Sequence, residues 1–275
     1  MRLGIFAKTF AGSDPLTVLT AARSAGFEAV QYNMACSGLA AMPDLITPEV
    51  TRAIQQASAD TGVAIAAVSG TYNMIHPDPS VRDAGMRRLA LLIENAAAMS
   101  TQMVTLCTGT CDPDDQWRGH PDNDSAAAWA LLCTEMGKAA DLAEAHGIKL
   151  GIEPELANVV SDAARARTLI DTLQSPSLAI VLDPANLFEV ETLSQQRRII
   201  SHAIAVLADR TLMAHAKDRD AQGGFVTAGQ GVVDFDHFLG SLRMAGFDGD
   251  LVTHGLHATE APDVARFLTD RLESL

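Results

Sequence analysis

Four residues with metal-binding side chains each close a short apolar run in the second half of the chain: Glu153, Asp183, His215 and His254. Two carboxylates and two imidazoles suit Mn²⁺, Co²⁺, Zn²⁺ or Fe²⁺, whereas Ca²⁺ prefers a shell made of oxygen atoms alone. Residues so far apart in the sequence can form one site only if the fold brings the ends of these runs together. If the fold brings these ends together, the residue types predict a binding site for one divalent ion.

Short apolar runs recur along the chain, as expected of parallel strands that are covered on both faces. They comprise residues 3–7, 28–32, 63–69, 102–107, 148–153, 177–183, 212–216 and 250–254. Segments with the apolar spacing of helices separate them, and this repeated alternation predicts a (β/α)8 barrel, or TIM barrel, with residues 1–275 as a single domain. The strands of such a barrel open at their carboxyl ends into one mouth, where active sites lie.

Residues with capping and helix-ending preferences punctuate the predicted helices. Asp14, Thr47, Asp78 and Asp234 mark helix starts, and Gly26, Gly62, Gly147 and Gly246 mark helix ends. The alternative fold is a doubly wound open sheet, which normally carries a glycine-rich turn after its first strand. The residues that follow the first run, AKTFAGSDP, do not form such a turn.

The composition narrows the classes of function. The 275 residues carry 20 − 34 = −14 formal charges, and such acidity opposes binding to nucleic acid. The chain shows neither a signal peptide nor an apolar stretch that approaches the roughly 20 residues of a membrane span. Its four cysteines lack CxxC spacing, which favours reduced thiols and a cytoplasmic location.

Two long connections are expected on the mouth side, at about residues 70–80 and 108–124. Loops of this length in a compact fold are usually functional or disordered, and we expect them to form a lid or a substrate-binding wall. The residues predicted to contact substrate are Lys8, His76, Trp117, His120 and Asn186. Glu155 would point the same way as Glu153 in the strand alternation, which Pro154 is expected to break.

A divalent ion in this mouth could bind a ketone oxygen and a neighbouring hydroxyl group of a sugar. It would then lower the pKa of the α-proton and stabilise the enediolate that forms when a carboxylate removes this proton. Return of the proton to the same carbon from the opposite face gives an epimer, and return to the neighbouring carbon gives an aldose–ketose isomer. A leaving group β to the carbanion would lead to elimination instead.

Over its whole length the chain resembles the sugar phosphate isomerase/epimerase family, the xylose isomerase-like barrels. The resemblance is carried by GTYNMIHPDP (70–79), WRGHPDN (117–123), GIEPE (151–155), VLDPANL (181–187), AHAKD (214–218), GQGVVDF (229–235) and AGFDGDLVTHGL (245–256). It implies an isomerase or epimerase of a keto-sugar or sugar phosphate that holds one divalent ion, with Mn²⁺ expected first and Co²⁺, Zn²⁺ or Fe²⁺ as alternatives. It also implies a homo-oligomer, either a dimer or a tetramer.

By motif, Glu153, Asp183 and His215 match three of the family's metal ligands. The fourth ligand position, where the epimerases carry a glutamate that completes the acid/base pair, is His254 here. Imidazole binds metal when neutral and exchanges protons near its reference pKa of about 6.5, so His254 is predicted as a metal ligand or, instead, as a catalytic group; one nitrogen is not expected to do both. Lys217 is the alternative proton donor. If it has no catalytic role, it is expected to form an ion pair with Asp218.

Three other readings stay open at this point. A metal-dependent keto-sugar lyase, hydratase or decarboxylase would use the same ion and Glu153, and its product would lack a group. An endonuclease IV-like phosphodiesterase would need further ligands and a basic rim, which the charge of −14 opposes. A barrel that binds sugar without catalysis would not need the intact ligand types at all four strand ends.

Overall fold

The computed structural model describes all 275 residues, and its central element is a closed barrel of parallel strands. The barrel strands are β1 (Arg2–Phe6), β2 (Ala29–Tyr32), β3 (Ala64–Ser69), β4 (Met103–Leu106), β5 (Lys149–Ile152), β6 (Leu178–Leu182), β7 (Thr211–Ala216) and β10 (Asp250–Thr253). Strands pair with their neighbours in chain order, and β10 closes the ring against β1 with Asp250 opposite Arg2. The predicted (β/α)8 barrel is confirmed, and each predicted strand is present.

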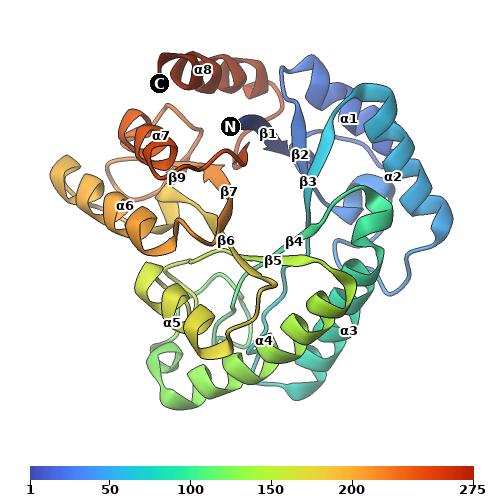
Figure 1. Cartoon of the computed structure of the whole chain (residues 1–275), viewed down its shortest axis with the longest axis vertical. Helices are drawn as coiled ribbons and strands as arrows, with labels where there is room; N and C mark the ends of the chain where they lie inside the picture. Colours follow the sequence, from blue (N-terminus) through green and yellow to red (C-terminus); the bar gives the residue numbers. More distant parts are fainter.

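The helices form a ring around the strands (Figure 1). They are α1 (Pro15–Ser24), α2 (Pro48–Thr61), α3 (Pro79–Ala96), α4 (Ala126–His146), α5 (Ala163–Leu173), α6 (Leu193–Leu207), α7 (Phe235–Met244) and α8 (Ala261–Ser274). Short 3-10 helices lie at Ala7–Thr9, Met34–Ser37, Ala97–Met99, Pro121–Asp124 and Pro184–Asn186. None of the helices combines the length and the apolarity that crossing a membrane requires.

The predicted helix boundaries follow from local chemistry. Asp14 precedes α1, and its carboxylate accepts a hydrogen bond of 2.9 Å from the backbone N–H of Thr17, which the helix itself leaves unpaired. Gly147 ends α4 with a φ of +67°, a left-handed conformation that favours glycine because it has no Cβ. Capping residues such as Asp14 and Gly147 therefore set where these helices begin and end.

The main core fills the space between strands and helices, while a small second cluster fills the barrel itself. This inner cluster consists of Ala67, Met103, Ala179, Val181, Met213 and Val252. Gly151 in β5 makes room for it, since a Cβ at this position would lie 2.4 Å from the terminal methyl of Met103. The side chains of the inner cluster form a solid floor below the mouth, so the barrel is not a channel.

A short antiparallel hairpin beside the mouth was not expected from the sequence. Its strands, β8 (Asp218–Arg219) and β9 (Phe225–Val226), directly follow β7.

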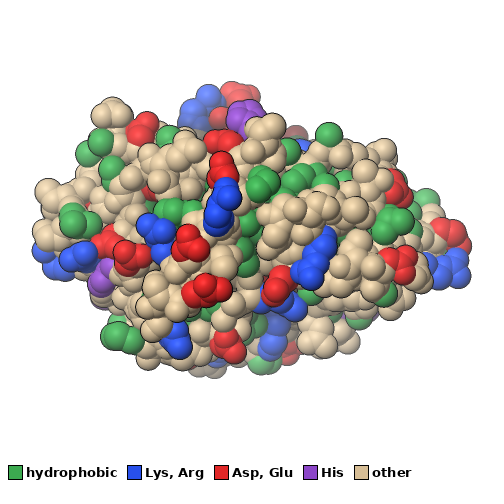
Figure 2. Space-filling view, turned by 90° about the horizontal axis from the view of Figure 1, so that it is seen from above, with side chains coloured by type: hydrophobic (Ala, Val, Ile, Leu, Met, Phe, Trp, Pro, Cys, Tyr) green, Lys and Arg blue, Asp and Glu red, His purple; other side chains and the backbone are tan.

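Seen at right angles to the view of Figure 1, the side of the barrel shows acidic and basic side chains interspersed (Figure 2). That face offers no continuous basic surface for a polyanion.

Candidate metal centre

The four predicted ligands converge at the mouth of the barrel. Glu153, Asp183 and His254 each follow the last residue of a strand, and His215 is the penultimate residue of β7. Each side chain offers one ligand atom, and these atoms all lie within 4.8 Å of one another. A cluster of this composition could bind a metal ion.

Asp183 lies at the base of the cluster and its side chain is fully buried. Its Oδ1 atom accepts a hydrogen bond of 2.9 Å from the backbone N–H of Ala185, which fixes the carboxylate. Its Oδ2 atom lies 3.4 Å from Nε2 of His254 and 3.8 Å from Nδ1 of His215. Burial would raise the pKa of Asp183, but the hydrogen bond from His254 and the charge of Lys217 outweigh it and lower this pKa to about 2. The carboxylate is therefore ionised, as a metal ligand must be.

Glu153 stands beside Asp183 and is held through one of its two oxygens. Oε1 accepts hydrogen bonds from Nδ2 of Asn186 at 2.8 Å and from Nδ1 of His215 at 3.1 Å. Oε2 makes no hydrogen bond, and the side chain is 22% exposed. One oxygen is thus fixed, while the other accepts no hydrogen bond from the protein.

Gln31 in β2 orients His215 and was not among the predicted site residues. Nε2 of Gln31 donates to Oγ1 of Thr105 at 3.0 Å, which leaves its Oε1 to accept from Nε2 of His215 at 2.8 Å. Nδ1 of His215 consequently faces the carboxylates. Burial lowers the pKa of His215, but Glu153 and Asp183 raise it further, with a net upward shift.

Such hydrogen bonds to the far nitrogen of a ligand histidine fix its orientation and strengthen metal binding. We expect the substitution Gln31→Leu to weaken metal affinity by about 10–100-fold, because Nε2 of His215 loses its acceptor. Competition between the protein and a fluorescent chelator for Mn²⁺ or Zn²⁺ measures this change. Gln31→Glu keeps an acceptor at the same place and is the matched control; equal loss in both variants would contradict the role.

His254 completes the cluster from β10. Its ring meets that of His215 edge to face, with the centroids 4.5 Å apart. Burial and the neighbouring His215 lower the pKa of His254, against the opposing influence of Asp183. The imidazole is therefore neutral at pH 7, the form in which histidine binds a metal.

Lys217 points into the mouth and does not pair with Asp218. Its ammonium nitrogen lies 3.3 Å from the centre of the Phe225 ring in β9 and 3.4 Å from Oδ1 of Asn186. The unexpected hairpin therefore positions this lysine beside the cluster. The predicted catalytic role of Lys217 requires such a place, and the alternative of an ion pair with Asp218 is not what the structure shows.

The carboxylate of Asp218 points instead into the turn before α7. It accepts backbone hydrogen bonds from Gly229 at 3.0 Å, Gly231 at 2.9 Å and Val233 at 2.9 Å. Backbone N–H groups of a glycine-rich turn such as this GQG segment could otherwise bind a phosphate. They are occupied by an internal anion, and the segment has a structural role.

The cluster opens into a cavity of about 470 Å³. Predicted site residues that line it are Lys8, Trp117, Glu153, Asn186, His215, Lys217 and His254. Residues that the sequence did not assign to the site also line it, among them Phe6, Gln31, Asn33, Ser69, Glu155 and Phe225. The cavity joins carboxylates, amides and ammonium groups to aromatic surfaces, the composition of a site for a small polar molecule.

Glu155 does face the cavity, although Pro154 separates it from β5. Burial first, and then the charge of Glu153, raise the pKa of Glu155 to about 7. The expected break at Pro154 therefore does not turn this side chain away. The site contains a second carboxyl group that is partly protonated at neutral pH.

The structure does not bring His76 or His120 to this cavity. Nε2 of His76 donates to the carbonyl of Pro113 at 3.0 Å, and its Nδ1 accepts from the N–H of Asp78 at 3.0 Å. Nδ1 of His120 accepts from the N–H of Asp122 at 3.2 Å and caps a 3-10 helix. Both rings are engaged in holding their own loops, and neither of them lines this cavity.

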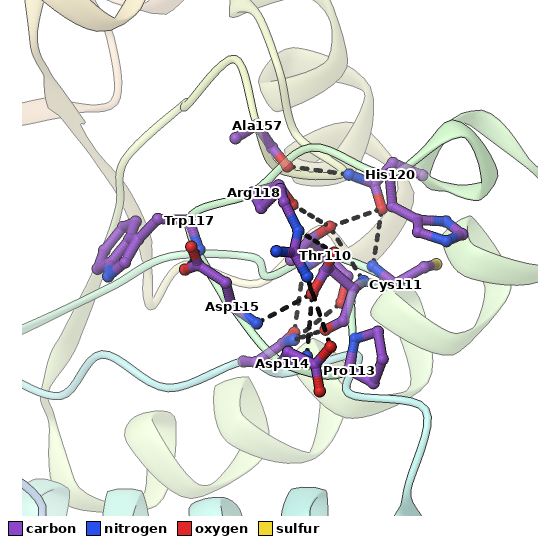
Figure 3. Close-up of polar contacts among 12 residues, drawn as sticks. Thr110, Cys111, Pro113, Asp114, Asp115, Trp117, Arg118, His120 and Ala157 are labelled. Carbon is purple, nitrogen blue, oxygen red and sulfur yellow. Dashed lines mark hydrogen bonds and ion pairs between the residues drawn. The ribbon is translucent and has the colours of Figure 1, made fainter.

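The loop at 108–124 holds Trp117 at the cavity by a fixed internal network (Figure 3). The guanidinium of Arg118 donates to the carboxylate of Asp112 at 2.7 Å, and Asn123 accepts from Thr110 at 3.1 Å. Trp117 and His120 project from this loop in opposite directions (Figure 3). The Trp117 side chain is 55% exposed, which leaves a large aromatic surface at the rim.

Comparison with known proteins identifies the family to which this chain belongs. The family model described as xylose isomerase-like TIM barrel matches residues 19–271. A 3-keto-D-glucoside 4-epimerase from E. coli has 15% identity and a TM-score of 0.77, with 98% of this chain and 99% of that chain covered. The IOLI protein with a binding zinc atom has 16% identity and a TM-score of 0.75, with 100% of this chain and 99% of that chain covered.

Another solved structure with this fold is that of a longer fusion protein. It is a xylose isomerase-like TIM barrel/4-hydroxyphenylpyruvate dioxygenase fusion protein with 19% identity and a TM-score of 0.76. All of this chain is covered, but it spans only 43% of the fusion protein. At these identities the solved structures show a shared fold.

Proposed function

The chain belongs to the xylose isomerase-like TIM barrel family, and on this premise we propose that it is a divalent-metal-dependent isomerase or epimerase of a keto-sugar. The observation that carries the proposal is the convergence of four ligand atoms within 4.8 Å at a cavity with a free carboxylate oxygen. The reaction is proton transfer at a carbon next to a carbonyl group. The solved 3-keto-D-glucoside 4-epimerase, which shares the fold, supports this class of chemistry.

The residues that would hold the ion are Glu153, Asp183, His215 and His254. Their nitrogen and oxygen donors suit Mn²⁺, Co²⁺, Zn²⁺ or Fe²⁺, and the zinc in the solved IOLI structure supports a metal in this fold. We propose Mn²⁺ first, since carboxylate and imidazole ligands both accept it. When bound, the ion would polarise the substrate carbonyl and favour loss of the α-proton.

The chain's own groups would move the proton. The free Oε2 atom of Glu153 is the base, because Oε1 is fixed by Asn186 and His215. His254 or Lys217 returns the proton to the substrate. Lys217 lies close to Asn186, which also bonds to Glu153, and Phe225 shields its ammonium group. Trp117 and Phe6 supply apolar surfaces on which a sugar ring can rest.

A free keto-sugar fits the cavity better than a sugar phosphate. Lys8 and Lys217 are the only lysine or arginine residues that line it. The glycine turn that could have bound phosphate already binds Asp218. The cavity therefore lacks the clustered cations that hold a phosphate group.

Solvent exchange tests the proposed function. We expect the metal-loaded protein to introduce deuterium from D2O into a keto-sugar at the carbon next to the carbonyl, without any other change in substrate mass. Mass spectrometry and NMR of the recovered sugars measure this, after elemental analysis has established about one Mn, Co, Zn or Fe per chain. No deuterium uptake across a panel of keto-sugars and metals would contradict the proposal.

A metal-dependent lyase, hydratase or decarboxylase is the second candidate. His254 favours it, because the family's epimerases carry a glutamate there and a single strand-end glutamate, Glu153, remains. Removal of a proton by Glu153 followed by loss of a β-substituent needs no second glutamate. A product lighter than the substrate by water, carbon dioxide or another leaving group, or heavier by water, would identify such a reaction in the same mass spectra.

A further inference from the structure

We propose that the site continues into a second hollow that takes the second ring of a keto-sugar glycoside, so that the substrate is larger than a monosaccharide. The inference rests on the proposed function and names the class of substrate for it. The second hollow has a volume of about 330 Å³ and lies between the loops that follow β3 and β4. Nothing in the proton-transfer chemistry uses it.

The two hollows are adjacent. Met42, from the connection between β2 and α2, lines both of them, and so does Gln116 from the loop after β4. These two side chains therefore lie where the two hollows meet. A ring that reacts beside Glu153 could extend a glycosidic substituent between Met42 and Gln116.

The walls of the second hollow are tied to each other by two hydrogen bonds, of which the first is buried. Nδ2 of Asn73 donates to the carbonyl of Thr110 at 2.8 Å, and Nε2 of His76 donates to the carbonyl of Pro113 at 3.0 Å. These bonds join the loop after β3 to the loop after β4. A space with walls fixed in this way is formed before a ligand arrives, which reduces the entropy that binding loses.

The surface of the second hollow combines an aromatic ring with polar side chains. Tyr72 packs over Gly85 of α3, where a Cβ would lie 2.1 Å from the ring. The absence of a side chain at Gly85 therefore lets the Tyr72 ring form part of the wall. Gln116, Asp114 and Asp115 also line the hollow, and the two aspartates are labelled on their loop in Figure 3. An apolar face together with hydrogen-bonding groups suits the C–H and O–H groups of a sugar ring.

The charges exclude an anionic substituent. The one guanidinium that lines the second hollow, Arg88, pairs with Asp44 at 2.7 Å. Asp114 pairs with Arg118 at 3.6 Å, whereas Asp115 forms no ion pair and no lysine lines this hollow. A phosphate or nucleotide would be repelled, whereas an uncharged glycosyl group would not.

Binding of matched sugars tests the second hollow independently of turnover. Calorimetry on the Mn²⁺-loaded protein compares D-fructose with isomaltulose, and 3-keto-D-glucose with 3-keto-cellobiose. Each pair shares a keto-sugar unit, and the second member adds one glucosyl ring. In the pair that the protein binds more tightly, we expect the Kd of the disaccharide to be at least about tenfold lower than that of the monosaccharide.

The substitution Val81→Trp places a large side chain in the second hollow from α3, where Val81 is 42% exposed and outside the core. We expect it to remove the advantage of the disaccharide and to leave the Kd of the monosaccharide unchanged. Asp83→Trp, on an exposed position of α3 that does not line the hollow, is the matched control. Equal affinity within both pairs, no binding by any of the four sugars, or an unchanged preference in Val81→Trp would each overturn the proposal. Deuterium uptake by the monosaccharides, measured alongside, shows whether the proposed function stands when the second hollow fails.

Discussion

Replacing Glu153 by glutamine lowers the rate of deuterium exchange into the keto-sugar by about 10²–10⁴-fold, the usual contribution of a positioned general base. Glutamine has nearly the same shape and keeps an oxygen that can accept from Asn186 at the place where Glu153 now does. It cannot accept a proton, and as a neutral group it is a weaker metal ligand. Loss of the base and weaker metal binding both lower the rate of deuterium exchange.

Measurement at saturating metal separates these two contributions. The rate of exchange is followed with increasing Mn²⁺, and the bound metal is determined in parallel by elemental analysis. The control is Glu189→Gln, the same change on an exposed residue that does not line the cavity. An exchange rate for Glu153→Gln within threefold of the Glu189→Gln rate, with metal bound, would remove Glu153 from the role of base.

Replacing Asp183 by asparagine abolishes the thermal stabilisation that metal gives to the native protein. A ligand that binds only the folded state stabilises it by about 2.7 kcal/mol at a concentration about 100 times its Kd. Asp183 is fully buried between the two imidazoles, so its charge is the part of the cluster least screened by solvent. Without that charge the cluster keeps one carboxylate, and we expect metal affinity to fall by more than the roughly 10–100-fold that follows from loss of an outer partner.

The unfolding temperature with and without Mn²⁺ or Zn²⁺ measures this effect in both proteins. Asp141→Asn, an exposed change on α4 away from the mouth, controls for the loss of one negative charge. We expect Asp141→Asn to respond to metal as the native protein does. A metal-induced rise in the unfolding temperature of Asp183→Asn equal to that of the native protein would show that the cluster does not hold the ion.

The barrel and its ligand cluster could be predicted because both depend on regular structure. Parallel strands are apolar on both faces, so a charged residue or histidine at the end of such a run is conspicuous, as at Asp183 and His254. The barrel then fixes where strand ends meet, whatever their separation in the chain. Knowledge of the strand boundaries to within two residues was sufficient for this purpose.

The rest of the site depends on side-chain directions that no periodicity records. Gln31 lies within a buried run and resembles a core residue until its contact with His215 is known. Glu155 follows a proline, so the strand alternation could not establish its direction. His76 and His120 lie in loops, where the direction of a ring is set by local acceptors and donors such as Pro113 and Asp122.

The distribution of the candidate site along the chain has a consequence for how this protein could change over evolutionary time. All four ligands come from Glu153 onwards, whereas every residue that lines the second hollow lies between Met42 and Gln116. Substitutions that reshape the second hollow therefore leave the ligand-bearing strands untouched. New substrate preferences could therefore arise between Met42 and Gln116 while the four ligands, and Gln31 that orients His215, stay the same.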